Sequence, residues 1–234
     1  MENRYNCDAA VNQLIYSAPF FQGLPRPVVE KAMSHFFTRT LLANQVIIQE
    51  KDWDSSVYFI LEGWVKVRTY NADGKEVTLN ILGKGELFGE MAALEQVPRS
   101  TDVITLTLTE MGNMPARDFV HLIHSEPLAG VRLSQLMARR LRQVNRRLRC
   151  RESDSMSRLA DTLLFLAEGQ GIQREGQTGT FIPKLPHKEL SSFSGLARET
   201  VTRVLQKLEN KGLILRNQQT ISIPDLQALE RQIV

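Results

Sequence analysis

The sequence is poor in cysteine: its 234 residues contain only two, Cys7 and Cys150. Two cysteines exclude a disulfide framework, a four-cysteine zinc site and a four-cysteine iron–sulfur cluster. The sequence also has no run of about 18 apolar residues, so we expect no transmembrane helix. Its first residues, MENRYNCDAA, hold no basic segment followed by an apolar stretch, which a secretory signal requires. We therefore expect a reduced, cytoplasmic protein without a membrane partner.

The composition is that of a globular protein with one large domain or two ordinary ones, since 42% of residues are hydrophobic and 24% charged. The net charge of +3 hides an uneven distribution. Residues 1–126 hold 11 Lys and Arg against 16 Asp and Glu, whereas residues 127–234 hold 18 against 10. This asymmetry suggests two domains with different partners. The basic part is suited to a polyanion, although a solvated basic surface would have the same composition.

The first 126 residues read as a β domain with helices at its start. Residues 8–34 show helical spacing at both ends, separated by the turn FFQGLPRP. Residues 36–119 then alternate short apolar runs with turn residues, and the NADG at 71–74 is a hairpin signal. Many short strands at this spacing predict an antiparallel sandwich or barrel. The predicted strand runs are QVIIQ, SVYFIL, WVKVRTY, EVTLNIL, ELFG and DVITLTLTEMGNM.

From Ala116 to about Arg151 the spacing is helical again. One set of apolar residues recurs at intervals of four, three and four, which is the pattern of a two-helix contact. Eight arginines and no acidic residue fall within residues 127–151, so this helix has one narrow apolar edge. We predict a parallel homodimer, although a contact inside one chain would give the same stripe. The predicted dimer seam is Met137, Leu141, Val144 and Leu148. Residues 152–157 are then a polar hinge before a helix over 158–168, and residues 169–179 a polar loop.

The last third has the spacing of a DNA-binding motif. A short helix over 188–194, with Leu190 and Phe193 inward, is followed by Gly195, where a tight turn favours glycine. A second helix then runs over 198–210 and buries its apolar face. Helix, glycine turn and helix form a helix-turn-helix, which places its second helix in the major groove. The expected DNA-contacting residues are Lys188, Arg198, Glu199, Thr202 and Arg203, with Gln206 on the same exposed face. Residues 213–223 read as two short strands of a wing; an ordinary helical hairpin is the alternative.

A ligand candidate lies in residues 85–101, GELFGEMAALEQVPRST. A glycine-flanked turn leads into a short helix, whose first backbone N–H groups suit an anion. Arg99 and Ser100 follow and can bind a phosphate. Glu90 suits a neutral donor such as a sugar hydroxyl, so the pair suggests a nucleotide monophosphate. A surface ion pair between Glu90 and Arg99 is the alternative.

Two of these segments resemble a known family. The segment FGEMAALEQVPRST is similar to the phosphate-binding cassette of cyclic-nucleotide-binding domains. The segment ELSSFSGLARETVTRVLQKLENKGLI resembles the helix-turn-helix of the cyclic AMP receptor and Fnr superfamily of bacterial transcription regulators. The resemblance runs from about residue 18 to 223. It implies an α+β chain with an antiparallel β jelly-roll domain (1–126), a dimerisation helix (127–152) and a winged helix-turn-helix domain (153–234).

The resemblance also implies the roles of individual residues. Glu90 would accept a hydrogen bond from the ribose 2′-hydroxyl of cyclic AMP, and Arg99 would pair with the cyclic phosphate. Ser100 and the backbone at Gly89 and Met91 would complete the cradle. Base edges would be read by Arg198, Glu199 and Arg203. The implied partners are palindromic double-stranded DNA with TGTGA-like half-sites, a second copy of the chain and RNA polymerase.

The sequence departs from the family pattern at several positions. Val144 and Asn145 stand where the family uses hydroxyl residues for the adenine, and only Asn145 can bond to it. Asn44 and Lys51 replace glycines, so Lys51 would be strained or lie in a different turn. Ala197 replaces a serine that caps the second helix.

Three competing functions remain open at this point. The effector could be cyclic GMP, 2-oxoglutarate or a redox signal, or DNA binding could be independent of any ligand. An enzyme is the least favoured, because no metal cluster or activated nucleophile accompanies Glu90 and Arg99. The four histidines are scattered along the chain and are expected at the surface rather than as metal ligands.

Overall fold

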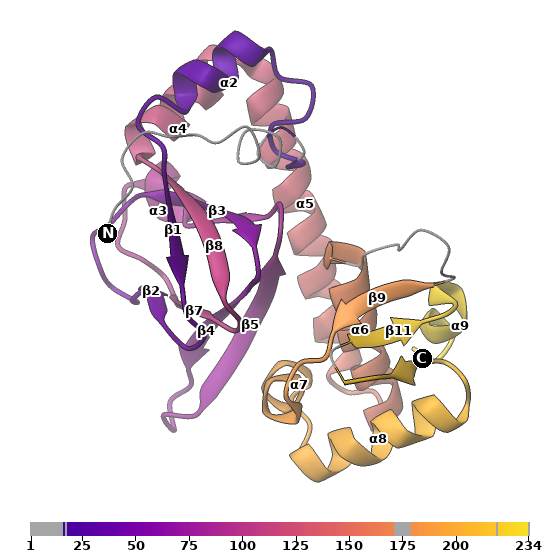
Figure 1. Ribbon diagram of the computed structural model, residues 1–234. Coiled ribbons are helices and arrows are strands. Elements are labelled where there is room, and N and C mark those ends of the chain that lie inside the picture. Colours follow the sequence, from indigo (N-terminus) through magenta and orange to yellow (C-terminus); the bar gives the residue numbers. More distant parts are fainter. Residues whose placement is uncertain (1–15, 17, 171–178, 219, 234) are drawn as a thin grey trace. The chain divides into compact units, whose positions relative to one another are not determined.

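The computed structural model describes residues 16, 18–170, 179–218 and 220–233 (Figure 1). The helix predicted around residues 11–15 and most of the predicted loop 169–179 lie outside these residues. The chain divides into two compact units, one of residues 1–74 and 79–139, the other of residues 75–78 and 140–234. The division at residue 139 falls inside the segment predicted as a separate dimerisation helix.

The first unit is built around the predicted antiparallel roll, which consists of two four-stranded sheets. The first sheet has the order β1-β8-β3-β6 and the second the order β2-β7-β4-β5. The strand bounds are β1 Phe37–Leu41, β2 Val46–Ile48, β3 Val57–Glu62, β4 Trp64–Tyr70, β5 Glu76–Gly83, β6 Leu87–Phe88, β7 Asp102–Thr105 and β8 Thr109–Met114. The predicted turn at 71–74 joins neighbouring β4 and β5, with Gly74 at a φ of 70°.

One predicted strand is wrong in extent. The run 102–114 forms two strands, β7 and β8, that lie in different sheets. Thr105 ends β7 because its buried hydroxyl donates to the carbonyl of Leu42 at 2.6 Å and its backbone pairs with Asn44 and Gln45. The chain then bends through residues 106–108 and crosses to the first sheet. Apolar alternation runs through both strands, so the pattern alone did not reveal the crossing.

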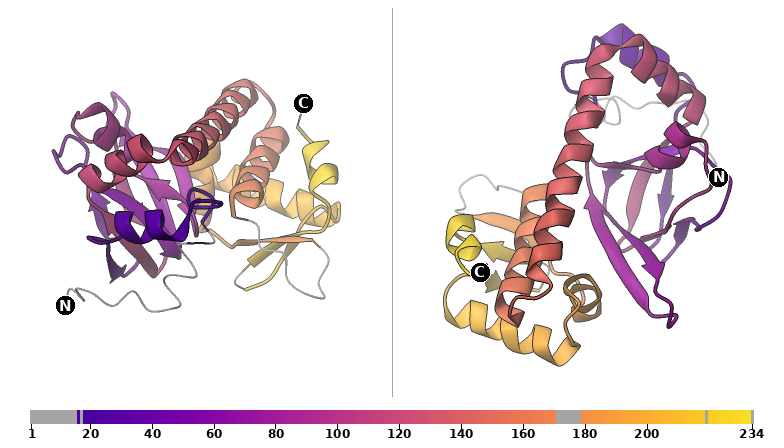
Figure 2. Two further views of the ribbon diagram at one scale, coloured as in Figure 1. Left: turned by 90° about the horizontal axis from the view of Figure 1, so that it is seen from above. Right: turned by 180° about the vertical axis from the view of Figure 1, so that it is seen from behind.

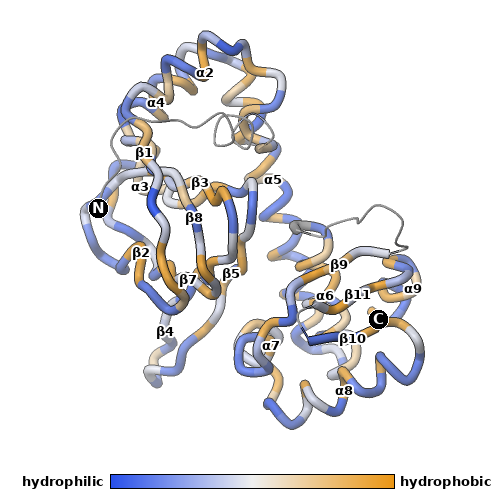
Figure 3. Tube along the Cα trace, in the orientation of Figure 1, coloured by the Kyte–Doolittle hydropathy of each residue, from blue (hydrophilic) through white to orange (hydrophobic). Residues whose placement is uncertain are grey.

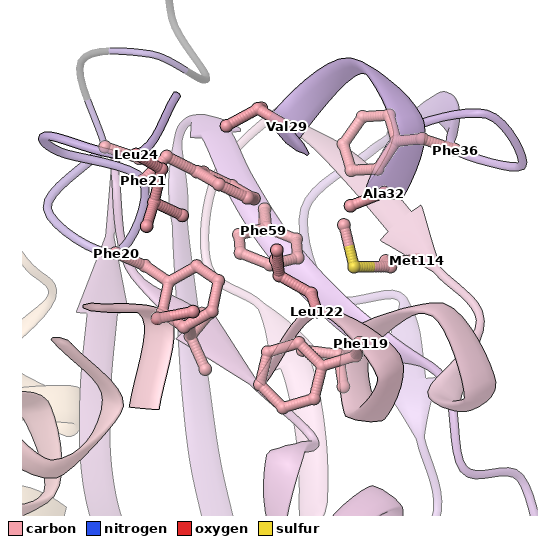
Figure 4. Packing of buried hydrophobic residues seen from close by; sticks show 14 of the residues in the cluster. Phe20, Phe21, Leu24, Val29, Ala32, Phe36, Phe59, Met114, Phe119 and Leu122 are labelled. Carbon is pink, nitrogen blue, oxygen red and sulfur yellow. The ribbon is translucent and has the colours of Figure 1, made fainter. Parts of the chain in front are cut away.

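The core of the roll contains a group of phenylalanines at one end of the first sheet (Figure 4). Phe20 packs against Phe21 and Phe119, with ring centroids 4.9 and 5.5 Å apart. Phe21 contacts Phe59 of β3 at 5.0 Å. These contacts hold the helices α2 (Arg26–Ala32), α4 (Ala116–Ser125) and the start of α5 (Pro127–Cys150) against the sheet. The single helical stretch predicted from Ala116 is therefore two helices, which break at Glu126 where the backbone is extended.

Lys51 has a φ of 73° and Asn44 one of 65°, so both take the left-handed backbone of the glycines they replace. The N–H of Lys51 donates to the carbonyl of Arg99 at 2.8 Å, which holds this turn against the cassette. A left-handed lysine costs roughly 1–2 kcal/mol. We expect Lys51→Gly to raise the free energy of unfolding by about 0.5–1 kcal/mol. Glycine removes the cost of the left-handed conformation, but its greater conformational entropy in the unfolded chain offsets part of this gain. Urea unfolding of the variant measures this, and an unchanged midpoint would contradict it.

The second unit holds the predicted winged helix-turn-helix (Figure 2). Its elements are α6 Ser155–Gln170, β9 Thr180–Pro183, α7 His187–Ser194, α8 Arg198–Asn210, β10 Leu215–Arg216, β11 Thr220–Ile223 and α9 Leu226–Glu230. The wing strand β11 pairs with both β10 and β9 in one antiparallel sheet. The predicted hinge 152–157 is too long, because α6 begins at Ser155. The side chain of Asp154 accepts from the N–H of Ser157 at 2.8 Å, which caps α6 early.

The two helices of the motif agree with their predicted positions. Gly195 follows α7 with a φ of 68°, as the tight turn requires. The face of α8 predicted to be apolar is buried, and hydrophobic and hydrophilic residues alternate along the helix (Figure 3). The buried residues of the two helices include Leu190, Phe193, Val201, Val204, Leu205 and Leu208.

Ala197 caps α8 without a side-chain hydrogen bond, as predicted. A serine there can accept from a free N–H of the first turn. We expect Ala197→Ser to raise the free energy of unfolding by about 1 kcal/mol. Ala197→Val, which adds no acceptor, is the matched control and should give no gain. Thermal unfolding of the two variants tests the prediction, and equal melting temperatures would refute it.

Candidate nucleotide pocket and DNA-reading helix

The cassette begins with a turn that only glycine fits. Gly89 precedes α3 (Glu90–Glu95) with a φ of 86°. A Cβ atom at Gly89 would lie 2.6 Å from Nη1 of Arg99 and 2.8 Å from the carbonyl oxygen of Ser56. The glycine is thus required both for its backbone angle and for the approach of the arginine.

The guanidinium of Arg99 is buried against this turn. Its side chain is 2% exposed. Nη1 donates to the carbonyl of Gly89 at 2.8 Å, and Nη2 donates to the carbonyl of Ser56 at 2.6 Å and to Asp54 at 2.8 Å. Nε is buried without a hydrogen-bond partner among the described residues. The arginine predicted from the sequence is therefore fixed in place by three hydrogen bonds, and its Nε donor is unused.

Sequence reasoning missed Asp54 and Tyr58, which complete this network. Asp54 lies in the loop before β3, and Tyr58 of β3 donates its hydroxyl to the Asp54 carboxylate at 2.9 Å. The Tyr58 ring stacks on Phe88, with centroids 5.2 Å apart. Burial would raise the pKa of Asp54, but hydrogen bonds from Arg99, Ser56 and Tyr58 outweigh it and hold the pKa below its usual value. No local spacing pointed to this aspartate, because Arg99 is 45 residues away in the chain.

The other predicted pocket residues take different positions. Glu90 is buried, with 5% exposure, whereas Met91 is half exposed and Ser100 exposed. Glu90 and Arg99 are both buried, which disfavours the alternative of an ion pair at the surface. Asn145 is an exposed residue of α5, and its contact with a base stays a prediction.

The exposed face of α8 presents the residues predicted to contact DNA. Arg198, Glu199, Thr202 and Arg203 are exposed on it, and Lys188 is exposed on α7. Sequence reasoning missed His187, whose Nδ1 lies 2.8 Å from the hydroxyl of Thr202 and so joins the two helices. The residues predicted to contact DNA thus include three cationic side chains, two on α8 and one on α7, and one carboxylate, which suits phosphates and base edges.

Arg158 of α6 holds the turn between the two helices. Its guanidinium donates to the carbonyls of Ser194 and Gly195, both at 2.8 Å from Nη2. A Cβ at Gly195 would lie 2.6 Å from the same nitrogen. The carbonyls at the end of α7 are thus satisfied by a cation, which also complements the negative end of the helix.

The last turns of α5 belong to the DNA-binding unit. Arg147 lies over the rings of Phe165 in α6 and Phe193 in α7, at 5.3 and 4.1 Å from their centroids. Burial lowers the pKa of Arg147 to about 10. Arg146 forms an ion pair with buried Asp161 of α6 and binds Glu168 through both Nη atoms. These contacts join α5 to both helices that support the reading face.

The predicted dimer seam is divided in the structure. Leu141, Val144 and Leu148 are exposed at 61%, 45% and 55%, so they are available to a partner. Met137 is half-buried and packs against the phenylalanine core of the roll. The seam residues therefore do not form one equally exposed stripe.

Within the described part of the chain, no helix is long and apolar enough to cross a membrane. Over the same residues, no group of three or more His, Cys, Asp and Glu side chains is placed to hold a metal ion.

Family models match both units. The cyclic nucleotide-binding domain matches residues 38–126, and the Crp-like helix-turn-helix domain matches residues 157–232. The first match contains the cassette with Gly89 and Arg99, and the second contains α7, α8 and the wing.

Individual relatives match over most of the chain. The cyclic AMP receptor protein of Thermus thermophilus is 32% identical over 214 residues, which are 91% of this chain and 95% of that protein. The cAMP-activated global transcriptional regulator CRP of Salmonella typhimurium is 31% identical, over 84% and 94% of the two chains. The structure of the c-di-GMP responsive regulator CLP of Xanthomonas campestris is similar in fold, with a TM-score of 0.63 at 23% identity, over 86% and 100%. These relatives are regulators rather than enzymes, and this chain likewise belongs to the Crp/Fnr family of DNA-binding transcription regulators with a cyclic-nucleotide-binding domain.

Proposed function

We propose that this regulator responds to cyclic AMP and binds, as a homodimer, to palindromic DNA with TGTGA-like half-sites. The observation that carries the proposal is the guanidinium of Arg99. It is buried at a glycine turn, and its Nε has no partner among the described residues. A buried N–H without an acceptor costs about 1–3 kcal/mol. An oxygen of a cyclic phosphate would remove that cost and balance the positive charge.

The other groups of the cassette fit the rest of such a ligand. Buried Glu90 is an acceptor for a ribose 2′-hydroxyl, and exposed Ser100 is a donor for a phosphate oxygen. Asn145 of α5 has both a donor and an acceptor for the edge of an adenine. Cyclic AMP is favoured over cyclic GMP by the two relatives named for it. The relative that responds to c-di-GMP makes that dinucleotide the second candidate.

Dimer formation would place two reading helices on one DNA duplex. The exposed Leu141 and Leu148 of α5 supply the apolar contact, and their spacing of seven is that of a two-helix seam. Asn145 lies between them in the sequence and is exposed, and its role toward the ligand is proposed from the family resemblance alone. Each α8 would then enter a major groove, about 34 Å from the other when the half-sites are one turn apart.

Ligand and DNA binding would be coupled through the population of the DNA-competent dimer. A ligand shifts such an equilibrium only by its different affinity for the two states. Arg146 and Arg147 fix the end of α5 to the reading unit, so a change in the dimer contact would be transmitted to α7 and α8. Contact with RNA polymerase is proposed from the family alone.

The experiment that tests this function is a titration of the purified protein with cyclic AMP, cyclic GMP and c-di-GMP. Calorimetry measures binding of each nucleotide, and fluorescence anisotropy measures binding to a palindromic TGTGA-type duplex. We expect cyclic AMP to bind most tightly and to increase DNA affinity. Equal DNA affinity with and without cyclic AMP would reject the proposed effector. Equal DNA affinity with and without each of the three nucleotides would favour a regulator that binds DNA independently of them.

A further inference from the structure

The guanidinium of Arg99 already has a carboxylate partner. Its Nη2 donates to Oδ2 of Asp54 at 2.8 Å. The arginine side chain is 2% exposed and the aspartate side chain 47%, so the carboxylate lies on the solvent side of the pair. A phosphate that approaches Arg99 from solvent therefore meets a second anion beside the same cation.

Three donors fix Asp54 in this position. Besides Arg99, the hydroxyl of Tyr58 binds Oδ2 at 2.9 Å, and the N–H of Ser56 binds Oδ1 at 3.0 Å. These bonds keep the carboxylate ionised, because they hold its pKa below the usual value despite burial. The loop is also held at its start, where Lys51 and Asp52 pair with the backbone of Arg99. Asp54 is thus a negative charge that its hydrogen bonds hold in a fixed position beside Arg99.

We propose that Asp54 is an internal competitor for the phosphate group of the nucleotide at Arg99. With Asp54 on Nη2 and a phosphate at the unused Nε, two anions would lie beside one cation and repel each other. Nucleotide binding must displace the carboxylate or tolerate its charge. Asp54 therefore sets the affinity of the pocket below the value that Arg99 alone would give. This inference rests on the proposed function, since it concerns the same pocket.

The test removes the charge and keeps the shape. Asp54→Asn retains Oδ1 as an acceptor for Ser56 but pairs weakly with Arg99. We expect the dissociation constant for cyclic AMP to fall by about two- to fivefold, the range for loss of one partly exposed competing ion pair. Tyr58→Phe keeps the ring on Phe88 and removes one bond that fixes the carboxylate, so it should give a smaller fall.

The matched control is Glu62→Gln. Glu62 lies at the end of β3, is 65% exposed and pairs with Lys84 at 2.9 Å rather than with Arg99. Its substitution removes the same charge from the same unit and should leave the dissociation constant unchanged. A gain in both variants would assign the effect to net charge and would overturn the proposal.

The remaining outcomes separate the inference from the proposed function. If the wild type binds cyclic AMP and Asp54→Asn binds equally or more weakly, Asp54 positions Arg99 instead of competing, and the inference is wrong. If circular dichroism shows that Asp54→Asn does not fold, the cyclic AMP affinity of Tyr58→Phe is compared with that of the wild type instead. An equal or weaker affinity of Tyr58→Phe would then reject the inference. If Asp54→Asn and Tyr58→Phe bind cyclic AMP and the wild type does not, the role of Asp54 as a competitor is confirmed. If wild type and variants all fail to bind any of the nucleotides tested, both the function and the inference are rejected.

Discussion

Replacing Arg99 by leucine should weaken cyclic AMP binding by at least about a hundredfold, since two or more charge-assisted hydrogen bonds of roughly 1.5–3 kcal/mol each are lost. The buried guanidinium is the group that balances the phosphate charge, and leucine offers no donor. Dependence of DNA binding on the nucleotide should disappear with it. Calorimetry and anisotropy on the same preparation measure the two effects.

Arg99 also binds the carbonyls of Gly89 and Ser56, so the variant needs a control for folding. Arg68→Leu is the matched variant, because Arg68 forms a partly buried ion pair with Asp102 in the same unit. It should lose a similar amount of stability and keep its nucleotide affinity. If Arg99→Leu binds the nucleotide as tightly as the wild type does, the assignment of the cassette as the nucleotide-binding site is wrong.

Replacing Glu199 by alanine should relax the base preference by roughly 1–3 kcal/mol at one position in each half-site. Glu199 is exposed in the first turn of α8, where a groove-binding helix meets base edges, and a carboxylate can accept from cytosine N4. Because a palindrome holds two half-sites, the discrimination lost over the whole site is twice that amount. Selection of binding sites from a random pool measures it.

Lys188→Ala provides the contrast. Lys188 is exposed at the start of α7, where a cation can meet a phosphate and carries no sequence information. Its loss should weaken binding to all sequences alike and lower the slope of affinity against salt by about 1. If Glu199→Ala keeps the wild-type base preference, a residue other than Glu199 reads the base pair assigned to it in each half-site.

Local spacing predicted the helices of the reading unit well, and it predicted some of the residues that lie together around Arg99. The positions of α7 and α8 follow from a helical period and one glycine, both of which are local. The cassette could be recognised because Gly89 and Arg99 are only ten residues apart. Asp54 could not be, since its partner is 45 residues away and joins it only through the pairing of the roll. The packing of Met137 against the roll could not be predicted either. The same narrow apolar edge in the sequence is expected whether a partner helix or the chain's own β domain covers it.

The end of α5 determines how the reading unit can be isolated. Its boundary was predicted at residue 153, but a fragment that begins there lacks Arg146 and Arg147. Asp161 would then be buried without its cation, and the rings of Phe165 and Phe193 would lose the side chain that covers them. A fragment for DNA binding without nucleotide should instead start near Arg140, where the second unit begins. In evolutionary terms, the reading unit cannot be exchanged between regulators without the last turns of the helix that precedes it.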